Sequence, residues 1–533
     1  MRLYFTDRRL RCEGHVLNQV ANLGANLGDV FAKKAVHPLA NAVELQRIIA
    51  DLPKDNAFKA IDKVVGILES TREAAGLSVD RLYELAWQLE DAARDHLGKL
   101  CHDYLHTSRL SRTEEERLWS ISHGYWALLA EVYERCLHGL PLGGRPAENL
   151  KAALPALCAR LIAALGALLK WDRFRYGPPA EGVWQRLGQA LLTAEAAGGA
   201  ATRKTLIGRP APSSPAQEYE KVMIFHAAST DSLTPLEIEL AERLIEHYLP
   251  GFVFTAEPSH DCVYWVDLQL AQPPQRLARM PSEARPSQRF YRPGPAHADL
   301  SALLHSLERG GQVPADLSLG GQYPGRTLIP VLRHLVAYLA PVPPQRQHDR
   351  HRVKHRMSVL NGLINAFVAF SAEFGGRPAG LQTESWVVDN VSRGGLGAVL
   401  TEQPADWVRV GALLTLQPEG GDNWILGIVR RYFRESGSEA RVGIETLARQ
   451  AISVELYLRG TSSQATATGI PALLLENRGE PGDVRVVLPP DSFDLQESLE
   501  CTLNGRQCQL APLVLLERTT DYELARYHLT RIA

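Results

Sequence analysis

A basic cluster of eleven residues, Arg346–Arg356 (RQHDRHRVKHR), contains four Arg and one Lys against a single Asp. With His neutral, five cations and one anion give a local charge of +4, whereas the whole chain has 58 Lys and Arg against 60 Asp and Glu. Guanidinium groups bind phosphate through paired hydrogen bonds and stack on nucleobase planes. A nucleic-acid polymer usually needs a broad basic surface, which this near-neutral chain lacks. The cluster therefore predicts local recognition of a small anionic ligand.

A second polar motif, Asn390-Val391-Ser392-Arg393-Gly394-Gly395, begins after the 33 residues 357–389. The apolar pair Val387-Val388 before it predicts a strand that enters a turn. Asn and Ser side chains hydrogen-bond the edge of a nucleobase, and Gly lets the backbone approach a ligand closely. The spacing RxxxR occurs twice in the cluster, at Arg346 and Arg350 and at Arg352 and Arg356. The second pair is favoured because Arg356 directly precedes the first predicted strand region.

Together the two motifs resemble the PilZ family, whose signature is RxxxR beside a β-barrel followed by [DN]xSxxG. The resemblance covers about residues 346–452, and the matching residues are Arg352, Arg356, Asn390, Ser392 and Gly395. It implies a receptor for the bacterial second messenger cyclic di-GMP, with no catalytic role and no cofactor. It also implies that the two arginines, on a tail before the barrel, grip phosphates and guanine faces. Asn390 and Ser392 would then read a guanine edge, and Gly395 would permit close contact.

Several alternatives to a one-ligand receptor stay open at this point. His351 before the first arginine leaves one or two ligand molecules equally compatible with the motif. An interaction scaffold with a ligand-free barrel is a second interpretation, and an enzyme in residues 218–340 that uses His226, His260 or Cys262 is a third. A phosphate-binding loop of a nucleoside triphosphatase at residues 320–327 is disfavoured, because Arg326 occupies the position where such a loop needs Lys. No residue pattern predicts a metal site.

The length of 533 residues predicts several domains, and the fold class is multidomain α+β. Apolar residues at three- and four-residue steps predict an N-terminal helical bundle over 1–205. A small α/β middle domain over 218–340 follows, with strands at Lys221–Phe225, Phe252–Phe254 and Val263–Val266. A PilZ-like antiparallel β-barrel over 346–452 begins with a strand at Ala366–Phe370. Residues 453–533 are predicted as a further β-rich domain, with a degenerate second barrel as one possibility.

Local signals add expectations about caps, turns and packing. Thr113–Glu116 and Thr234–Glu237 match the capping box that begins a helix. Asn504-Gly505 predicts a two-residue hairpin in which Cys501 faces Cys508. Large aromatic residues in the bundle are expected in its core, namely Trp87, Trp119, Trp126 and Tyr133.

Few cysteines and the absence of an apolar leader predict a cytoplasmic protein with reduced thiols. The apolar stretch Leu154–Leu169 is interrupted by Arg160, which predicts a buried helix and no membrane span. The expected partners are cyclic di-GMP and an unidentified protein. The sequence predicts no oligomeric state.

Overall fold

The computed structural model describes most of the chain from residue 38 to residue 532. The described ranges are 38–72, 76–107, 110–139, 148–208, 211–279, 281, 283–345, 348–371, 382–401, 405–435, 439–458, 469–475 and 482–532. Residues 1–37 of the predicted bundle and Arg346 of the basic cluster lie outside these ranges.

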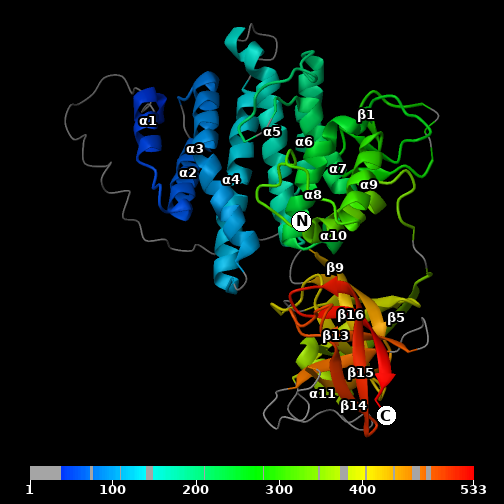
Figure 1. Ribbon diagram of the computed structural model, residues 1–533. Coiled ribbons are helices and arrows are strands. Elements are labelled where there is room, and N and C mark those ends of the chain that lie inside the picture. Colours follow the sequence, from blue (N-terminus) through cyan, green and yellow to red (C-terminus); the bar gives the residue numbers. More distant parts are fainter. Residues whose placement is uncertain are drawn as a thin grey trace.

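A layer of helices begins the described chain, and Figure 1 shows its first six helices side by side. They are α1 Ala42–Ala50, α2 Ala57–Arg72, α3 Val79–His106, α4 Arg112–His138, α5 Glu148–Phe174 and α6 Val183–Ala196, preceded by the short 3-10 helix Pro38–Ala40. The predicted apolar stripe of α3, from Leu82 to Leu100, is buried against its neighbours. Burial of these faces is the main driving force that stabilises such a layer.

Two local expectations for this layer were wrong. The capping box of α4 is Ser111 with Glu114, two residues before the predicted Thr113–Glu116. Ser111 fits the same signature, and its side chain accepts from the backbone N–H of Glu114. Trp87 is 37% exposed and lies outside the core, whereas Tyr133 is fully buried. Trp119 and Trp126 are partly buried against the core.

The helix α5 contains the predicted apolar stretch and also the one candidate membrane span among the described residues, Ala152–Phe174. Its length and composition alone would suit a bilayer. In this structure 61% of its most apolar window is buried inside the protein, and Leu161, Leu165 and Leu168 are at most 1% exposed. It therefore packs here as the central helix of the layer, as the sequence predicted.

Four more helices and one small sheet complete the helical half of the molecule. The helices are α7 Pro215–Ala227, α8 Pro235–Tyr248, α9 Ala296–Glu308 and α10 Gly325–Tyr338, with 3-10 helices at Thr230–Ser232 and Leu249–Gly251. The antiparallel sheet has the order β1-β4-β2-β3, formed by Val253–Thr255, Gln288–Arg292, Tyr264–Asp267 and Gln275–Arg276. The predicted capping box Thr234–Glu237 begins α8 as expected.

The predicted strand Lys221–Phe225 is wrong, because these residues form the middle of α7. Ser214 caps the helix and Pro215 occupies its first turn, a strong helix start that the sequence interpretation missed. Val222, Met223, Ile224 and Phe225 are all buried. A short apolar run that is buried on every side has no periodicity to distinguish helix from strand.

The first barrel is closed by six antiparallel strands in the order β10-β7-β6-β5-β8-β9. Its strands are β5 His351–Asn361, β6 Glu384–Val391, β7 Gly395–Leu400, β8 Leu413–Pro418, β9 Ile425–Arg434 and β10 Ala440–Ala448. The predicted strand Ala366–Phe370 is wrong, because it lies in the helix α11, Gly362–Ser371. Leu363, Ala366 and Ala369 are buried at three-residue steps, a helical spacing.

The second barrel lies beside the first, at the end of the molecule opposite the helices (Figure 1). It is closed in the order β11-β12-β13-β16-β15-β14, so the second-barrel alternative for residues 453–533 is confirmed. The strands are β11 Ala451–Leu458, β12 Ile470–Leu475, β13 Asp483–Leu488, β14 Leu499–Leu503, β15 Arg506–Arg518 and β16 Glu523–Arg531. A shared apolar cluster with α11, including Leu413, Leu473 and Leu524, joins the two barrels.

The hairpin between β14 and β15 has the predicted register. Cys501 pairs with Cys508, and Leu503 pairs with Arg506 across the Asn504-Gly505 turn. Both thiols are free. Asn504 and Gly505 have φ angles of 50° and 75°, the left-handed values that this turn requires.

We therefore expect Gly505→Ala to lower the free energy of unfolding by about 1–2 kcal/mol, because a Cβ is disfavoured at that φ angle. Urea unfolding followed by circular dichroism measures it. Gly66→Ala in α2 is the control, since a Cβ there meets nothing within 4 Å. The control is expected to stabilise the helix slightly. Equal effects of the two substitutions would contradict the turn assignment.

Candidate functional site

The candidate site lies on neighbouring strands of the first barrel. Arg352 and Arg356 were predicted on a tail before the barrel, but both lie within β5, so that expectation was wrong. β5 pairs antiparallel with β6, and Arg352 lies directly opposite Asn390. The sequence did not predict this strand, because none of its first six residues has a buried side chain. The segment therefore lacks the alternation of apolar and polar residues that indicates a strand. The two motif halves are thus brought together by β-sheet pairing.

A bulge in β5 separates the two arginines. The register shifts between Arg352 and His355, so Val353 and Lys354 have no partner on β6. A bulge bends a strand and increases its twist. Arg352 and Arg356 nevertheless face the same side of the sheet, because their partners Asn390 and Val387 pair with Gly397 and Val399, two residues apart on β7. Arg356 lies opposite Val387, and its guanidinium donates to the Ser385 hydroxyl at 3.4 Å.

The cations of this surface have no acidic partners. Arg350, Arg352, Lys354 and Arg356 are exposed, as is Arg393 in the turn. In the described part of the chain, none of these five lies within 4.0 Å of a carboxylate oxygen. Their charge is therefore available to an anion.

The two carboxylates of β6, Asp389 and Glu384, are engaged elsewhere. Asp389 pairs with Arg441 at 3.1 Å and accepts from the Asn390 amide. The hydrogen bond to Glu435 is the largest cause that raises the pKa of Arg441, followed by the negative charge of Glu435. Arg441 therefore stays positively charged and keeps Asp389 paired. Glu384 accepts from two indole N–H groups on the other side of β6. The surface around the two arginines thus keeps a positive field.

The turn between β6 and β7 is built by Ser392 and Gly395. The Ser392 backbone N–H and hydroxyl both donate to the Gly395 carbonyl, at 2.8 and 3.1 Å. The hydroxyl oxygen keeps its acceptor lone pairs. Ser392 is therefore positioned to accept from a ligand while its own proton fixes the turn.

Two glycines of β7 allow close approaches that a side chain would block. A Cβ on Gly395 would lie 2.0 Å from the Ile444 carbonyl oxygen of β10. A Cβ on Gly397 would lie 2.4 Å from the Asn390 Nδ2, since Asn390 and Gly397 are cross-strand partners. Gly395 thus lets β7 pair with β10, and Gly397 leaves room for the Asn390 amide.

A stacked pair of tryptophans in and against the barrel core was missed by the sequence interpretation, and Trp386 is only 3% exposed. Trp386 of β6 and Trp407 stack with ring centroids 5.4 Å apart, and Glu384 accepts from both indoles at 2.9 and 2.6 Å. Trp386 pairs across the strands with Met357 of β5, the residue after Arg356. In the sequence only the spacing of Glu384 and Trp386, two residues apart on one strand, indicates a contact between them. Trp407 lies 23 residues after Glu384, so spacing does not predict its contact.

The residues of the rival enzyme hypothesis do not converge. His226 is partly buried and packs edge-on against Trp184, and desolvation lowers its pKa to about 3. Cys262 is buried beside Ser259, whereas His260 is exposed. None of the three lines the larger cavity of the helical half. The loop 320–324 leads into α10 at Gly325, a helix entry as predicted.

Comparison with known proteins gives one family match. Residues 43–259, from α1 to β1, match the family described as "Cyclic-di-GMP receptor FimW, N-terminal domain". No curated protein matches the chain. The family match ends before both barrels, and the PilZ-like motifs lie outside the matched residues. The two resemblances therefore come from separate parts of the chain. Through residues 43–259 the chain is therefore similar to a cyclic-di-GMP receptor family, the same class of protein that the barrel motifs resemble.

Proposed function

We propose that this protein is a cytoplasmic cyclic di-GMP receptor, and that the ligand binds on β5, β6 and the β6–β7 turn. One observation carries the proposal: Arg352 and Asn390, from motifs far apart in sequence, are direct cross-strand partners on a surface of unpaired cations. The proposed contacts are Arg352 and Arg356 with phosphates and guanine faces, and Asn390 and Ser392 with a guanine edge. Gly395 supports the site through the β7–β10 pairing.

The chemistry of the ligand suits this surface. Cyclic di-GMP carries two phosphates and two purine faces, so its site needs cations that also stack on rings. Guanidinium groups do both, and they keep their charge at any physiological pH. Asn390 offers an amide with donors and an acceptor, which complements the mixed edge of guanine.

Strand β9 offers a route from the site to the rest of the molecule. The β6–β7 turn leads into β7, which pairs with β10, and β10 pairs with β9. On β9, Arg430 binds Glu517 of the second barrel through two hydrogen bonds at 2.5 and 2.7 Å. The next residue, Arg431, donates to the Tyr338 hydroxyl of α10 at 2.6 Å.

Further contacts join the end of β9 to the helices. Tyr432 packs against Tyr176, with ring centroids 5.2 Å apart, and the Arg434 N–H donates to the Tyr176 carbonyl at 2.8 Å. Tyr176 has a φ of 56°, which is unusual for a residue with a side chain. We propose that ligand binding at the turn changes the position of the barrel on the helices, and that a partner protein recognises the change.

Calorimetric titration of the folded protein with cyclic di-GMP tests the proposal. Saturable binding that weakens with salt is the expected result, because phosphate contacts are screened. The stoichiometry decides between one and two ligand molecules. No binding by a sample with native circular dichroism would overturn the receptor assignment and favour the scaffold alternative.

A glycine substitution probes Asn390 without removing a ligand contact. In Gly397→Ala the new methyl group occupies the space of the Asn390 amide, so the amide must shift. We expect cyclic di-GMP binding to weaken about tenfold, the effect of one lost hydrogen bond to a charged or strongly polar group. Gly66→Ala in α2, outside the barrel, is the control, since a Cβ there meets nothing within 4 Å. Unchanged binding by Gly397→Ala would remove Asn390 from the site.

A further inference from the structure

A second bulge, in β6, brings two neighbouring side chains of the barrel site together. Val388 pairs with Ala398 of β7, and the next pair is Asn390 with Gly397. Asp389 is therefore an extra residue without a partner on β7. In a regular strand the side chains of neighbouring residues point to opposite faces, and a bulge interrupts this alternation. The Asn390 Nδ2 accordingly donates a hydrogen bond to the Asp389 Oδ1.

Asp389 is held in place by a cation from two strands away. Its Oδ2 accepts from the Arg441 Nη1 at 3.1 Å, and the Arg441 Nε donates to Glu435. Arg441 lies on β10 and pairs with Val399 of β7, so this ion pair spans β7 to reach the bulge. The two carboxylate oxygens of Asp389 are thus divided between Arg441 and Asn390.

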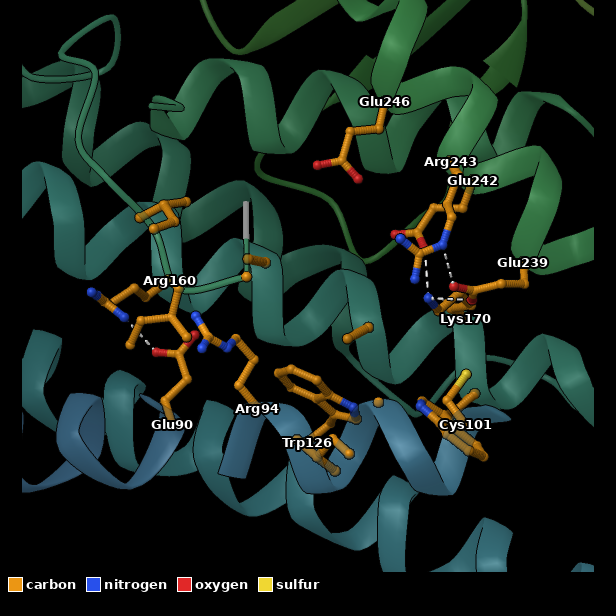
Figure 2. A pocket seen from close by; sticks show the side chains of 18 residues that line it. Glu90, Arg94, Cys101, Trp126, Arg160, Lys170, Glu239, Glu242, Arg243 and Glu246 are labelled. Carbon is orange, nitrogen blue, oxygen red and sulfur yellow. Dashed lines mark hydrogen bonds and ion pairs between the residues drawn. The ribbon is translucent and has the colours of Figure 1, made fainter. Parts of the chain in front are cut away.

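This ion pair lies at the surface and contributes little to holding the fold together. The pair of Arg160 with Glu90 in the helical half, drawn in Figure 2, has side chains that are only 10% exposed. Asp389 and Arg441 are 34% and 53% exposed. Ion pairs between exposed groups add little stability, because solvent screens them. The pair does, however, determine the orientation of the Asn390 amide.

The orientation follows from the chemistry of the two groups. An ionised carboxylate only accepts hydrogen bonds, so the Asn390 amide must turn its NH₂ group toward Asp389. The Asn390 Oδ1 accepts no hydrogen bond in the described part of the chain. Ser392 donates its hydroxyl proton to the Gly395 carbonyl, so its Oγ is also left as an acceptor. The site therefore offers a ligand two acceptors, from Asn390 and Ser392.

We propose that Asp389, held by Arg441, is a positioning residue that makes the site select guanine over adenine. Guanine presents adjacent N1–H and N2–H donors, which two acceptors satisfy together. Adenine presents its N6 amino donor beside the bare N1 acceptor, which would face an acceptor of the protein. Such a mismatch leaves polar groups unpaired and is rejected strongly. Because the bases bind at the same surface, this role of Asp389 rests on the proposed function.

Calorimetric titration with two cyclic dinucleotides tests the role of Asp389. Cyclic di-GMP and cyclic di-AMP carry the same phosphates and sugars, so the ratio of their affinities isolates base recognition from the charge of the surface. We expect the full-length wild type to bind cyclic di-GMP about a hundredfold or more tightly than cyclic di-AMP.

Asp389→Asn removes the constraint on the amide with little change of shape. A side-chain amide both donates and accepts, so either orientation of the Asn390 amide then finds a partner. We expect the affinity ratio to fall about tenfold or more. Loss of the negative charge favours both anionic ligands alike, and a loosened barrel would weaken both alike. Only a positioning role changes the ratio.

Two further variants complete the test. Arg441→Met leaves the Asp389 carboxylate in place without its cation, so the ratio should fall in the same direction by a smaller factor. Glu497→Gln is the control, because it removes an exposed carboxylate charge from the second barrel and should leave the ratio at the wild-type value. A thermal melt verifies that each variant is folded.

The outcomes separate the role of Asp389 from the receptor proposal. Tight binding of cyclic di-GMP by Asp389→Asn, with an unchanged ratio, would overturn the role of Asp389 and leave the receptor intact. Equal affinity of the wild type for the two dinucleotides would also overturn it. An unchanged ratio in Arg441→Met alone would remove Arg441 from the network. No binding of either dinucleotide by the folded wild type would overturn both proposals.

Discussion

Replacing Arg352 or Arg356 by Ala is expected to weaken cyclic di-GMP binding about tenfold to a hundredfold. The estimate follows from a charge-assisted hydrogen bond, worth about 1.5–3 kcal/mol, and about 1.4 kcal/mol corresponds to a tenfold change in affinity. Both side chains are exposed and unpaired with carboxylates, so their loss should leave the barrel folded. Calorimetry gives the affinity, and a thermal melt verifies the fold.

Lys354→Ala distinguishes specific contacts of the two arginines with the ligand from the nonspecific attraction of the positively charged surface. Lys354 is exposed on the same strand and carries the same charge, but it lies in the bulge without a β6 partner. We expect its substitution to change affinity less than threefold at physiological salt, where exposed charges are largely screened. If all three substitutions had equal effects, the RxxxR motif would have no specific role. If none had an effect, ligand recognition would have to occur outside the barrel.

The sequence was informative where local chemistry determines the structure. Thr234, Pro235 and Glu237 formed the predicted helix start, because a cap depends only on adjacent residues. Asn504-Gly505 fixed the register of Cys501 and Cys508, because only a left-handed turn joins these strands with two residues. These signals needed no knowledge of tertiary packing.

Tertiary burial explains most of the wrong elements. Residues 221–225 and 366–370 are short apolar runs, and either a helix or a strand buries such a run equally well. In both cases the neighbouring elements decide: α7 packs on α5, and α11 fills the space between the two barrels. The prediction for residues 351–356 was wrong for the opposite reason, because a strand segment with no buried side chain lacks the alternation of apolar and polar residues that predicts a strand.

The candidate site also has parts that the sequence predicted and parts that it did not. The sequence predicted Arg352 and Asn390 as parts of one site, and the structure places them opposite each other on β5 and β6. It gave no sign that Glu384 joins Trp386 to Trp407, or that Arg94, Trp126 and Arg160 share a cavity. Such groupings depend on the crossing of strands and helices, which spacing along the chain does not specify.

The buried pair of Arg160 and Glu90 gives the largest expected effect on stability. Arg160→Met removes the cation that pairs with the Glu90 carboxylate, and each side chain of the pair is only 10% exposed. We expect the free energy of unfolding to fall by about 3–5 kcal/mol, the usual cost of an uncompensated buried charge. Arg47→Met, which breaks the exposed pair with Glu44, is the control and should change the free energy of unfolding far less.

The double variant Glu90→Gln/Arg160→Met decides why the pair exists. Removing both charges also removes their desolvation cost, so most of the lost stability should return. Urea unfolding of the wild type, both single variants and the double variant gives the coupling energy. A double variant close to the wild type in stability would mean that the ion pair adds no net stability to the fold. A double variant as unstable as the single ones would mean that the charged pair itself is needed to join α3 to α5.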